Sequence, residues 1–155
     1  MSIGLGMALH LKMAQALSRV FVVLGDGECG EGSVWEAAMC AGKHGLSNLT
    51  AIVDYNKQQA YGNMRDVQDL EPFADKWRAF GFAVYDVDGH NISELREVFT
   101  SLPLDPAKPT AVIAHTVKGK GASFAENNPN WHHKNKVTDQ EISSLLSAIG
   151  GIKDA

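Results

Sequence analysis

Cysteine is scarce in this sequence, and its placement excludes a common class of metal site. The two cysteines, Cys29 and Cys40, do not form a CxxC pair, and no further cysteine or close histidine cluster completes a zinc site. Two unpaired thiols are typical of small buried side chains in a reducing compartment. We therefore expect both thiols to be free and the protein to be cytoplasmic.

Basic clusters and long apolar runs are also missing. The net charge is −4, and no basic stripe with interleaved aromatic residues is present, which argues against nucleic acid as a partner. No stretch approaches the ~20 apolar residues that a membrane helix needs. The apolar start has no basic leader, and His10 and Lys12 follow it, so we expect neither a membrane anchor nor a signal peptide.

What is present is typical of one globular domain. The chain has 155 residues, of which 45% are hydrophobic and 21% are charged, and this is enough to bury a sizeable core. We find no internal repeat, low-complexity tract or domain boundary. Residues 1–155 are therefore treated as a single domain.

Apolar runs alternate with helical patterns along the chain. Four runs have the composition of buried strands: 20–24, 49–55, 82–87 and 110–115. Helices are expected around these runs, at 3–17 and beginning near residues 33, 72, 91 and 138. This alternation predicts an α/β fold with a parallel sheet and helices on both faces.

Several local signals support the helices. Three pairs have the spacing of a capping box: Ser33 with Glu36, Asn91 with Glu94, and Thr138 with Glu141. Gly4 and Gly6, in the first helix, are expected to permit close packing of the backbone or to mark the entry of the helix. The aromatic residues of the third helix, Phe73, Trp77 and Phe80, are interpreted as core.

Two oxygen-bearing side chains follow neighbouring strands of the expected sheet. Asp26, between Gly25 and Gly27, follows the first apolar run, and Asn56 follows the second. Because parallel strands joined by a helix end side by side, these side chains can converge. Mg²⁺ prefers oxygen ligands and usually takes one or two protein groups plus phosphate and water. The glycines are expected to let the backbone turn sharply beside a phosphate. The pattern predicts Mg²⁺ holding a diphosphate.

The wider sequence resembles a known signature. Gly-Asp-Gly, then Glu31-Gly32, then an Asn at a strand end roughly thirty residues later, is similar to the signature of thiamine diphosphate enzymes. The run GDGECGEGSVWEAAMCAGKHGLSNLTAIVDYNKQQAYG resembles transketolases, especially amino-terminal subunits of split transketolases. The resemblance implies the thiamine diphosphate-binding fold, thiamine diphosphate and Mg²⁺ as cofactors, and transfer of a two-carbon ketol unit between sugar phosphates. Deoxyxylulose-phosphate synthase and dehydrogenase E1 components share the signature and remain alternatives.

The resemblance also implies roles for individual residues. The backbone carbonyl of Gln58 would complete the metal ligands with Asp26 and Asn56. Gly25, Gly27 and Glu28 would lie near the pyrophosphate, and Tyr61 would line the cofactor site.

A histidine and a glutamate carry two further expectations. Family members have a histidine at the end of a later loop that reaches the diphosphate and the substrate, and His132 corresponds to it as the catalytic residue. His133 stands where the family usually has glycine. Glu31 corresponds to glutamates that couple paired active sites, and the alternative is a solvated loop carboxylate.

Finally, the resemblance implies a partner. Thiamine enzymes bind the aminopyrimidine on a second domain, and no counterpart of that domain is recognisable here. A separate pyrimidine-domain subunit, in a homo- or hetero-oligomer, is therefore expected. Amino-terminal subunits of the family also have residues upstream of the segment that Ser2 begins, so we expect this chain to lack an upstream segment. A non-catalytic binding module is the alternative from another class.

Overall fold

The computed structural model of the chain describes residues 1–131, 134–148 and 150. Its helices are α1 (Ser2–Met13), α2 (Gly32–Lys43), α3 (Met64–Val67), α4 (Phe73–Ala79), α5 (Ile92–Thr100) and α6 (Asp139–Ala148). Its strands are β1 (Val20–Gly25), β2 (Leu49–Tyr55), β3 (Gln58–Gln59), β4 (Gly62–Asn63), β5 (Ala83–Asp88) and β6 (Thr110–His115). Two 3₁₀ turns cover Glu28–Gly30 and Pro129–Trp131.

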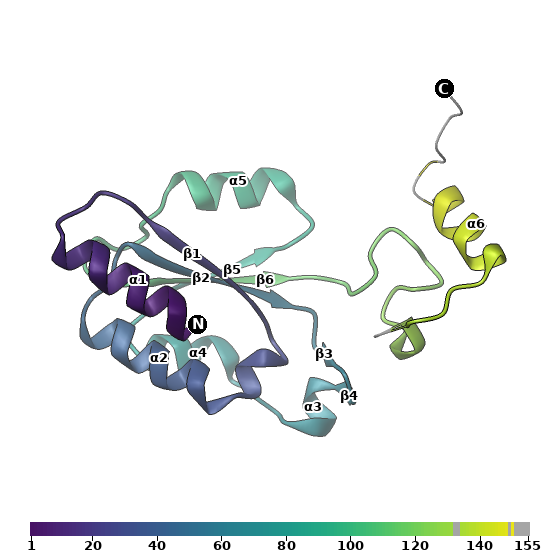
Figure 1. Cartoon of the computed structure of the whole chain (residues 1–155), viewed down its shortest axis with the longest axis horizontal. Coiled ribbons are helices and arrows are strands. Elements are labelled where there is room, and N and C mark those ends of the chain that lie inside the picture. The colour runs from purple at the N-terminus through teal and green to yellow at the C-terminus, as the bar shows by residue number, and fades with distance from the viewer. Residues whose placement is uncertain (132–133, 149, 151–155) are drawn as a thin grey trace.

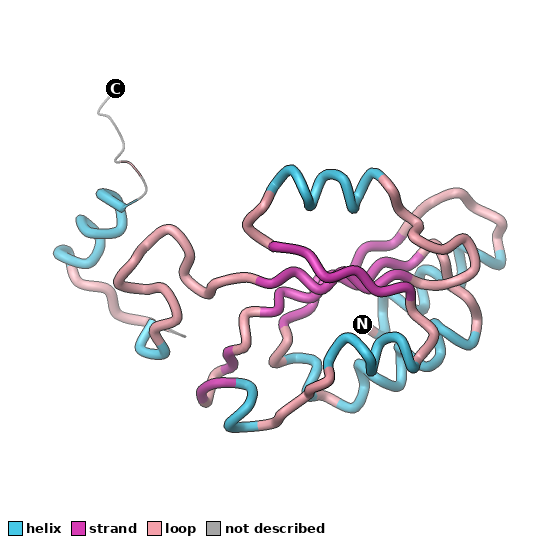
Figure 2. Tube along the Cα trace, turned by 180° about the vertical axis from the view of Figure 1, so that it is seen from behind, coloured by secondary structure: helices cyan, strands magenta, loops and turns pink. Residues whose placement is uncertain are grey.

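Four parallel strands form the central sheet, in the order β1-β2-β6-β5. Helix α5 covers one face, and α1, α2 and α4 lie on the other (Figures 1 and 2). The crossovers put consecutive strands in parallel, so all four carboxyl ends meet at one edge of the sheet. Tyr55, the last residue of β2, lies opposite His115, the last residue of β6. The predicted α/β fold is thereby confirmed.

The main core lies between the sheet and the helices α1, α2 and α4. Trp77 is fully buried, and its ring contacts Trp35 and Phe82 at centroid distances of 5.2 and 5.0 Å. Phe73 and Phe80 contact Trp35 in the same cluster. The interpretation of these aromatic residues as core is confirmed, and burying each such ring contributes roughly 1.5–3 kcal/mol.

Two helix predictions need correction. Helix α1 ends at Met13 rather than near residue 17, because the backbone turns at Gln15 with a φ of 54°. The predicted capping box of Ser33 and Glu36 is wrong: α2 begins at Gly32, and its N-cap residue Glu31 makes no side-chain cap bond.

The other two caps are present. The Asn91 Oδ1 accepts a hydrogen bond from the Glu94 backbone N–H at 3.2 Å. At α6 both halves of the capping box form, because the Glu141 N–H donates to the Thr138 Oγ1 at 3.3 Å and the Thr138 N–H donates to the Glu141 carboxylate at 2.9 Å. Polar spacing therefore located two of the three expected helix starts.

Glycines bring helices α1 and α2 close to their neighbours. A Cβ on Gly4 would lie 2.3 Å from the Val22 Cγ2 of β1, which confirms the expectation of close packing for Gly4. A Cβ on Gly6 would meet nothing within 4 Å, so the expectation of close packing is wrong for Gly6. A Cβ on Gly42 would lie 1.8 Å from the carbonyl oxygen of Phe80, the residue that ends α4. Positions 4 and 42 both need glycine for space.

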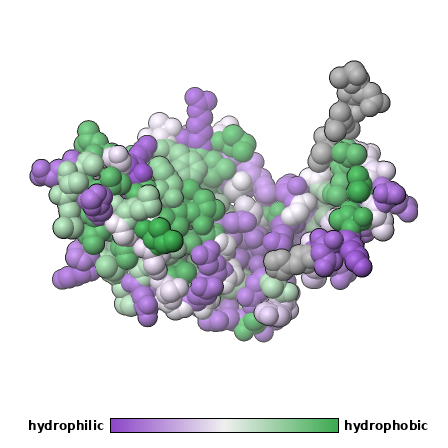
Figure 3. All heavy atoms as spheres, in the orientation of Figure 1, coloured by the Kyte–Doolittle hydropathy of each residue, from purple (hydrophilic) through white to green (hydrophobic). Residues whose placement is uncertain are grey.

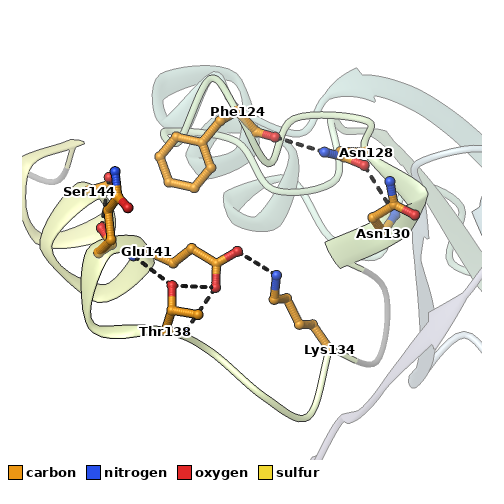
Figure 4. A network of polar contacts seen from close by, with 8 residues as sticks. Phe124, Asn128, Asn130, Lys134, Thr138, Glu141 and Ser144 are labelled. Atoms are coloured by element: carbon orange, nitrogen blue, oxygen red, sulfur yellow. Dashed lines mark hydrogen bonds and ion pairs between the residues drawn. The ribbon is translucent and has the colours of Figure 1, made fainter.

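The segment after β6 extends away from the sheet and carries α6 (Figure 1). None of the described α6 residues is buried. Lys134 holds the start of α6, because its Nζ lies 2.5 Å from the Glu141 Oε1 (Figure 4). In a neighbouring loop, the Asn128 side chain donates a hydrogen bond to the Phe124 carbonyl at 3.0 Å.

Apolar side chains gather on the face that carries α1 and β1 (Figure 3). On these elements Ile3 and Val23 are 83% and 70% exposed. Among the described residues, none of the helices has the length and apolar character needed to cross a membrane.

Candidate functional site

The carboxyl ends of β1 and β2 form the floor of a polar pocket of about 380 Å³. Six residues predicted from the sequence line it together: Gly25, Asp26, Gly27, Glu28, Asn56 and Gln58. The convergence follows from the parallel register, in which Gly25 lies opposite Asp54. The expected juxtaposition of Asp26 and Asn56 is therefore present.

Asp26 is the buried acid of this pocket, with 1% of its surface exposed. Its Oδ1 accepts the Gly27 backbone N–H at 2.8 Å, and its Oδ2 accepts the backbone N–H of Lys57. Burial raises the pKa of the Asp26 carboxyl; the two backbone N–H groups act in the opposite direction, and the charge of Asp54 adds to the increase. No cationic side chain hydrogen bonds to this carboxylate within the described part of the chain, so its charge is only partly compensated.

Asn56 is held at both ends of its amide. Its Oδ1 accepts the Gln58 backbone N–H at 3.0 Å, and its Nδ2 donates to the Asp54 Oδ2 at 3.3 Å. The intervening Lys57 has a positive φ of 64°, and this turn directs its N–H to Asp26. The loop after β2 thus ties Asn56 to Asp26 through its own backbone.

The glycines of the Gly-Asp-Gly motif do not adopt the left-handed torsions that only glycine favours. Gly27 has a helical φ of −59°, and Gly25 is not among the described residues with positive φ, while the expected approach of this backbone to a phosphate stays a prediction. Gly27 leaves room for a close neighbour instead, because a Cβ there would lie 3.0 Å from the Cβ of Gln59, and Gln59 would have to shift by a few tenths of an ångström. The β3–β4 hairpin therefore packs directly on the motif.

Two acidic residues stand at the entrance of the pocket. Glu28 begins the turn after Gly27, and Glu31 is the N-cap residue of α2; both are exposed and line the pocket. The first backbone N–H groups of α2 lie beside them, and such groups attract anions. The pocket therefore combines a buried carboxylate with a helix end suited to phosphate.

Tyr61 and His132 are the two remaining predicted site residues. Tyr61, between β3 and β4, is 89% exposed and does not line the pocket. His132 and His133 fall outside the described residues, so the catalytic role expected of His132 stays a prediction.

Sequence reasoning missed two contributors, Asp54 and Thr116. Asp54 and Lys118 also line the pocket, and Thr116 donates its hydroxyl to the Asp54 carboxylate. From the sequence, Lys118 could meet phosphate, although a solvated role is favoured; in the structure its charge acts to lower the pKa of Asp26. Their position in the sequence could have indicated that Lys118 and Thr116 lie near the site, because both follow β6 at the same edge of the sheet.

A second, larger cavity of about 570 Å³ is also lined by Asp26. Tyr55 lines it, donates its hydroxyl to the Glu71 carboxylate and stacks on Phe73 at a centroid distance of 5.0 Å. Glu71 also accepts the Phe73 backbone N–H at 2.9 Å. These contacts fasten the end of β2 to the start of α4.

Comparison with known proteins gives a consistent result. Residues 12–153 match the family described as "Transketolase, thiamine diphosphate binding domain". The chain is 41% identical to an apulose-4-phosphate transketolase subunit of Phocaeicola vulgatus, over 90% of this chain and 50% of that protein. It is 42% identical to the 6-deoxy-6-sulfo-D-fructose transketolase subunit SqwG of a Clostridium species, over 96% of this chain and 54% of that protein.

A solved structure shares the fold. The transketolase of Campylobacter jejuni superposes with a TM-score of 0.87 at 26% identity, over 96% of this chain and 24% of that one. The chain spans about half the length of the curated subunits it matches. From its family match, these similarities and the converging Gly-Asp-Gly and Asn56 loops, the chain belongs to the transketolase family and carries its thiamine diphosphate-binding domain.

Proposed function

We propose that this chain binds the diphosphate of thiamine diphosphate through Mg²⁺, held by the Asp26 carboxylate, the Asn56 amide oxygen and the Gln58 carbonyl. The observation that carries the proposal is the buried Asp26 carboxylate, which is satisfied by backbone N–H groups and lies beside Asn56 in one polar pocket. A divalent cation there would offset the unfavourable burial of the carboxylate.

The chemistry of the donor set fits this cation. Each Asp26 oxygen accepts one N–H and keeps a lone pair, and so does the Asn56 oxygen. Within the described residues, no group of three or more His, Cys, Asp or Glu side chains could hold a metal. That leaves a small number of oxygen ligands from the chain, to be completed by phosphate oxygens and water, as Mg²⁺ prefers.

We further propose that the chain acts with a pyrimidine-domain subunit to transfer a two-carbon ketol unit between sugar phosphates. Thiamine diphosphate, when bound, supplies the chemistry that stabilises the transferred unit. The residues of this chain bind and orient it: Asp26 and Asn56 fix the diphosphate, and the N-terminus of α2 adds backbone donors beside it. The names of the two relatives above, each a transketolase subunit, support a partner subunit here.

The test is a calorimetric titration of thiamine diphosphate into the full chain, with and without Mg²⁺. We expect binding that requires Mg²⁺ and is lost in Asp26→Ala, with the fold retained by circular dichroism. Asp88→Ala is the matched control, because Asp88 also ends a strand of this sheet but does not line the pocket. Equal affinity of Asp26→Ala and the wild-type chain would contradict the metal assignment.

A further inference from the structure

We infer that Asp54 is a positioning residue that fixes the orientation of the Asn56 amide toward the cation, and that Thr116 holds Asp54 in place. The inference rests on the proposed function, because it concerns how the chain prepares an oxygen ligand. Both positioning groups lie at the carboxyl edge of the sheet, Asp54 near the end of β2 and Thr116 directly after β6.

An ionised carboxylate only accepts hydrogen bonds, and this decides which way the amide faces. The Asp54 Oδ2 lies 3.3 Å from the Asn56 Nδ2, so the amide nitrogen must face Asp54. The amide oxygen consequently faces the opposite side, where the Gln58 N–H donates to it at 3.0 Å. Because the two ends of an amide have nearly the same shape, partners rather than packing must distinguish them.

Asp54 needs an anchor of its own because it is exposed. Its Oδ1 accepts the hydroxyl of Thr116, the first residue after β6. The backbone reinforces this bond, since the Thr116 N–H donates to the carbonyl of Tyr55 at 3.3 Å. With one oxygen on Thr116 and the other on Asn56, the carboxylate is held on both sides.

Asp54 also contacts the residue that follows β1. The Asp26 backbone N–H donates to the Asp54 carbonyl at 3.2 Å, so the side chain and backbone of Asp54 together contact the ends of β1, β2 and β6. Asp54 thus contacts the Asn56 side chain and the Asp26 backbone, the two residues whose side chains are proposed to hold the cation. Substitution of such an outer partner typically lowers metal affinity by about 10–100-fold.

The experiment measures the Mg²⁺ concentration that half-saturates the full chain at a fixed excess of thiamine diphosphate, by calorimetry. Asp54→Glu and Thr116→Val both keep the charge of residue 54 but disturb its geometry. We expect each to raise the half-saturating concentration by about tenfold or more. Thr116→Ser keeps the hydroxyl and should behave as the wild type does.

Two further variants separate position from charge. Asp54→Asn removes the charge beside the pocket, and Glu97→Gln removes the same charge from the exposed, remote helix α5. If Asp54→Asn weakens Mg²⁺ binding while Asp54→Glu and Thr116→Val match the wild type, Asp54 acts through its charge alone and the inference is overturned.

A second measurement needs no cofactor. In the metal-free full chain, the Asn56 side-chain amide protons, followed by ¹⁵N-resolved NMR, should exchange faster in Asp54→Glu and Thr116→Val than in the wild type and Thr116→Ser. Unchanged exchange would refute the role of Asp54. If the wild type binds no Mg²⁺ with thiamine diphosphate, the proposed function fails, and the exchange rates still decide whether Asp54 orients the amide.

Discussion

Replacing Gly42 by alanine should destabilise the chain although it improves the helix propensity of α2. The added Cβ would lie 1.8 Å from the Phe80 carbonyl oxygen, whereas real Cβ contacts are essentially never below 3.0 Å, so the elements must separate by at least 1.2 Å (3.0 minus 1.8). The obstacle is backbone at the end of α4, three residues after the buried Trp77, and it cannot rotate away as a side chain would.

The magnitude follows from two opposing terms. Overpacking of this kind costs about 3 kcal/mol at the upper end of its usual range, and alanine in place of a helical glycine returns about 1 kcal/mol. The net loss is about 2 kcal/mol, which lowers the melting temperature by about 4–8 °C in a chain of this size.

Gly6→Ala is the matched control, because Gly6 is also inside a helix but its added Cβ meets nothing within 4 Å. It should raise the melting temperature by about 2–4 °C. Urea and thermal unfolding of both variants, followed by circular dichroism, measure the difference. A Gly42→Ala chain as stable as Gly6→Ala would refute the assignment of a close contact between α2 and the end of α4.

Three further predictions concern hydrogen bonds outside the pocket. Tyr55→Phe removes the donor to Glu71 and should cost about 1–2 kcal/mol in urea unfolding at pH 7. The Tyr55 hydroxyl lowers the pKa of Glu71 from 4.5, so the stability difference between the wild type and Tyr55→Phe should be present above pH 4.5. It should vanish as the pH falls through the lowered pKa of Glu71. A stability difference that persists in acid would contradict this prediction. Asn91→Ala removes the cap of α5 and should cost about 1 kcal/mol in the same assay, while Asn91→Asp should cost little. The Lys134 ammonium holds the pKa of Glu141 down to about 2, so the start of α6 should loosen as the pH falls from 4.5 toward that value. Amide chemical shifts of α6 would report this, and Glu141→Gln should lack the transition.

The strands were the most predictable part of the fold. Residues 49–55 and 110–115 form β2 and β6 with the predicted bounds, because each is a mostly apolar run that is central in the sheet and mostly buried. The proximity of Asp26 and Asn56 could also be predicted from the sequence, because parallel strands with helical crossovers must end at a common edge.

Contacts made between distant loops could not be predicted. The sequence suggests that Gly27 serves a sharp turn of the backbone. The structure shows instead that Gly27 lies close to Gln59, which the β3–β4 hairpin brings against it. Asp54 and Thr116 carry no motif, and their bond depends on the neighbouring positions of β2 and β6. The end of α1 was missed because helix propensity continues past Met13 while the backbone turns at Gln15.

The position of β1 at the edge of the sheet has a consequence for how binding and folding are linked. Within the described chain β1 pairs only with β2, just as β5 pairs only with β6, so each of these two outer strands can open by breaking a single ladder. A cation shared by the Asp26 loop and the Asn56 loop would join this outer strand to a central one, much as a cross-link does. At a hundred times its dissociation constant, a ligand that binds only the closed form adds about 2.7 kcal/mol to that closure. Addition of Mg²⁺ and thiamine diphosphate should then slow amide exchange more in β1 than in β5. This difference would report occupancy of the site without any substrate.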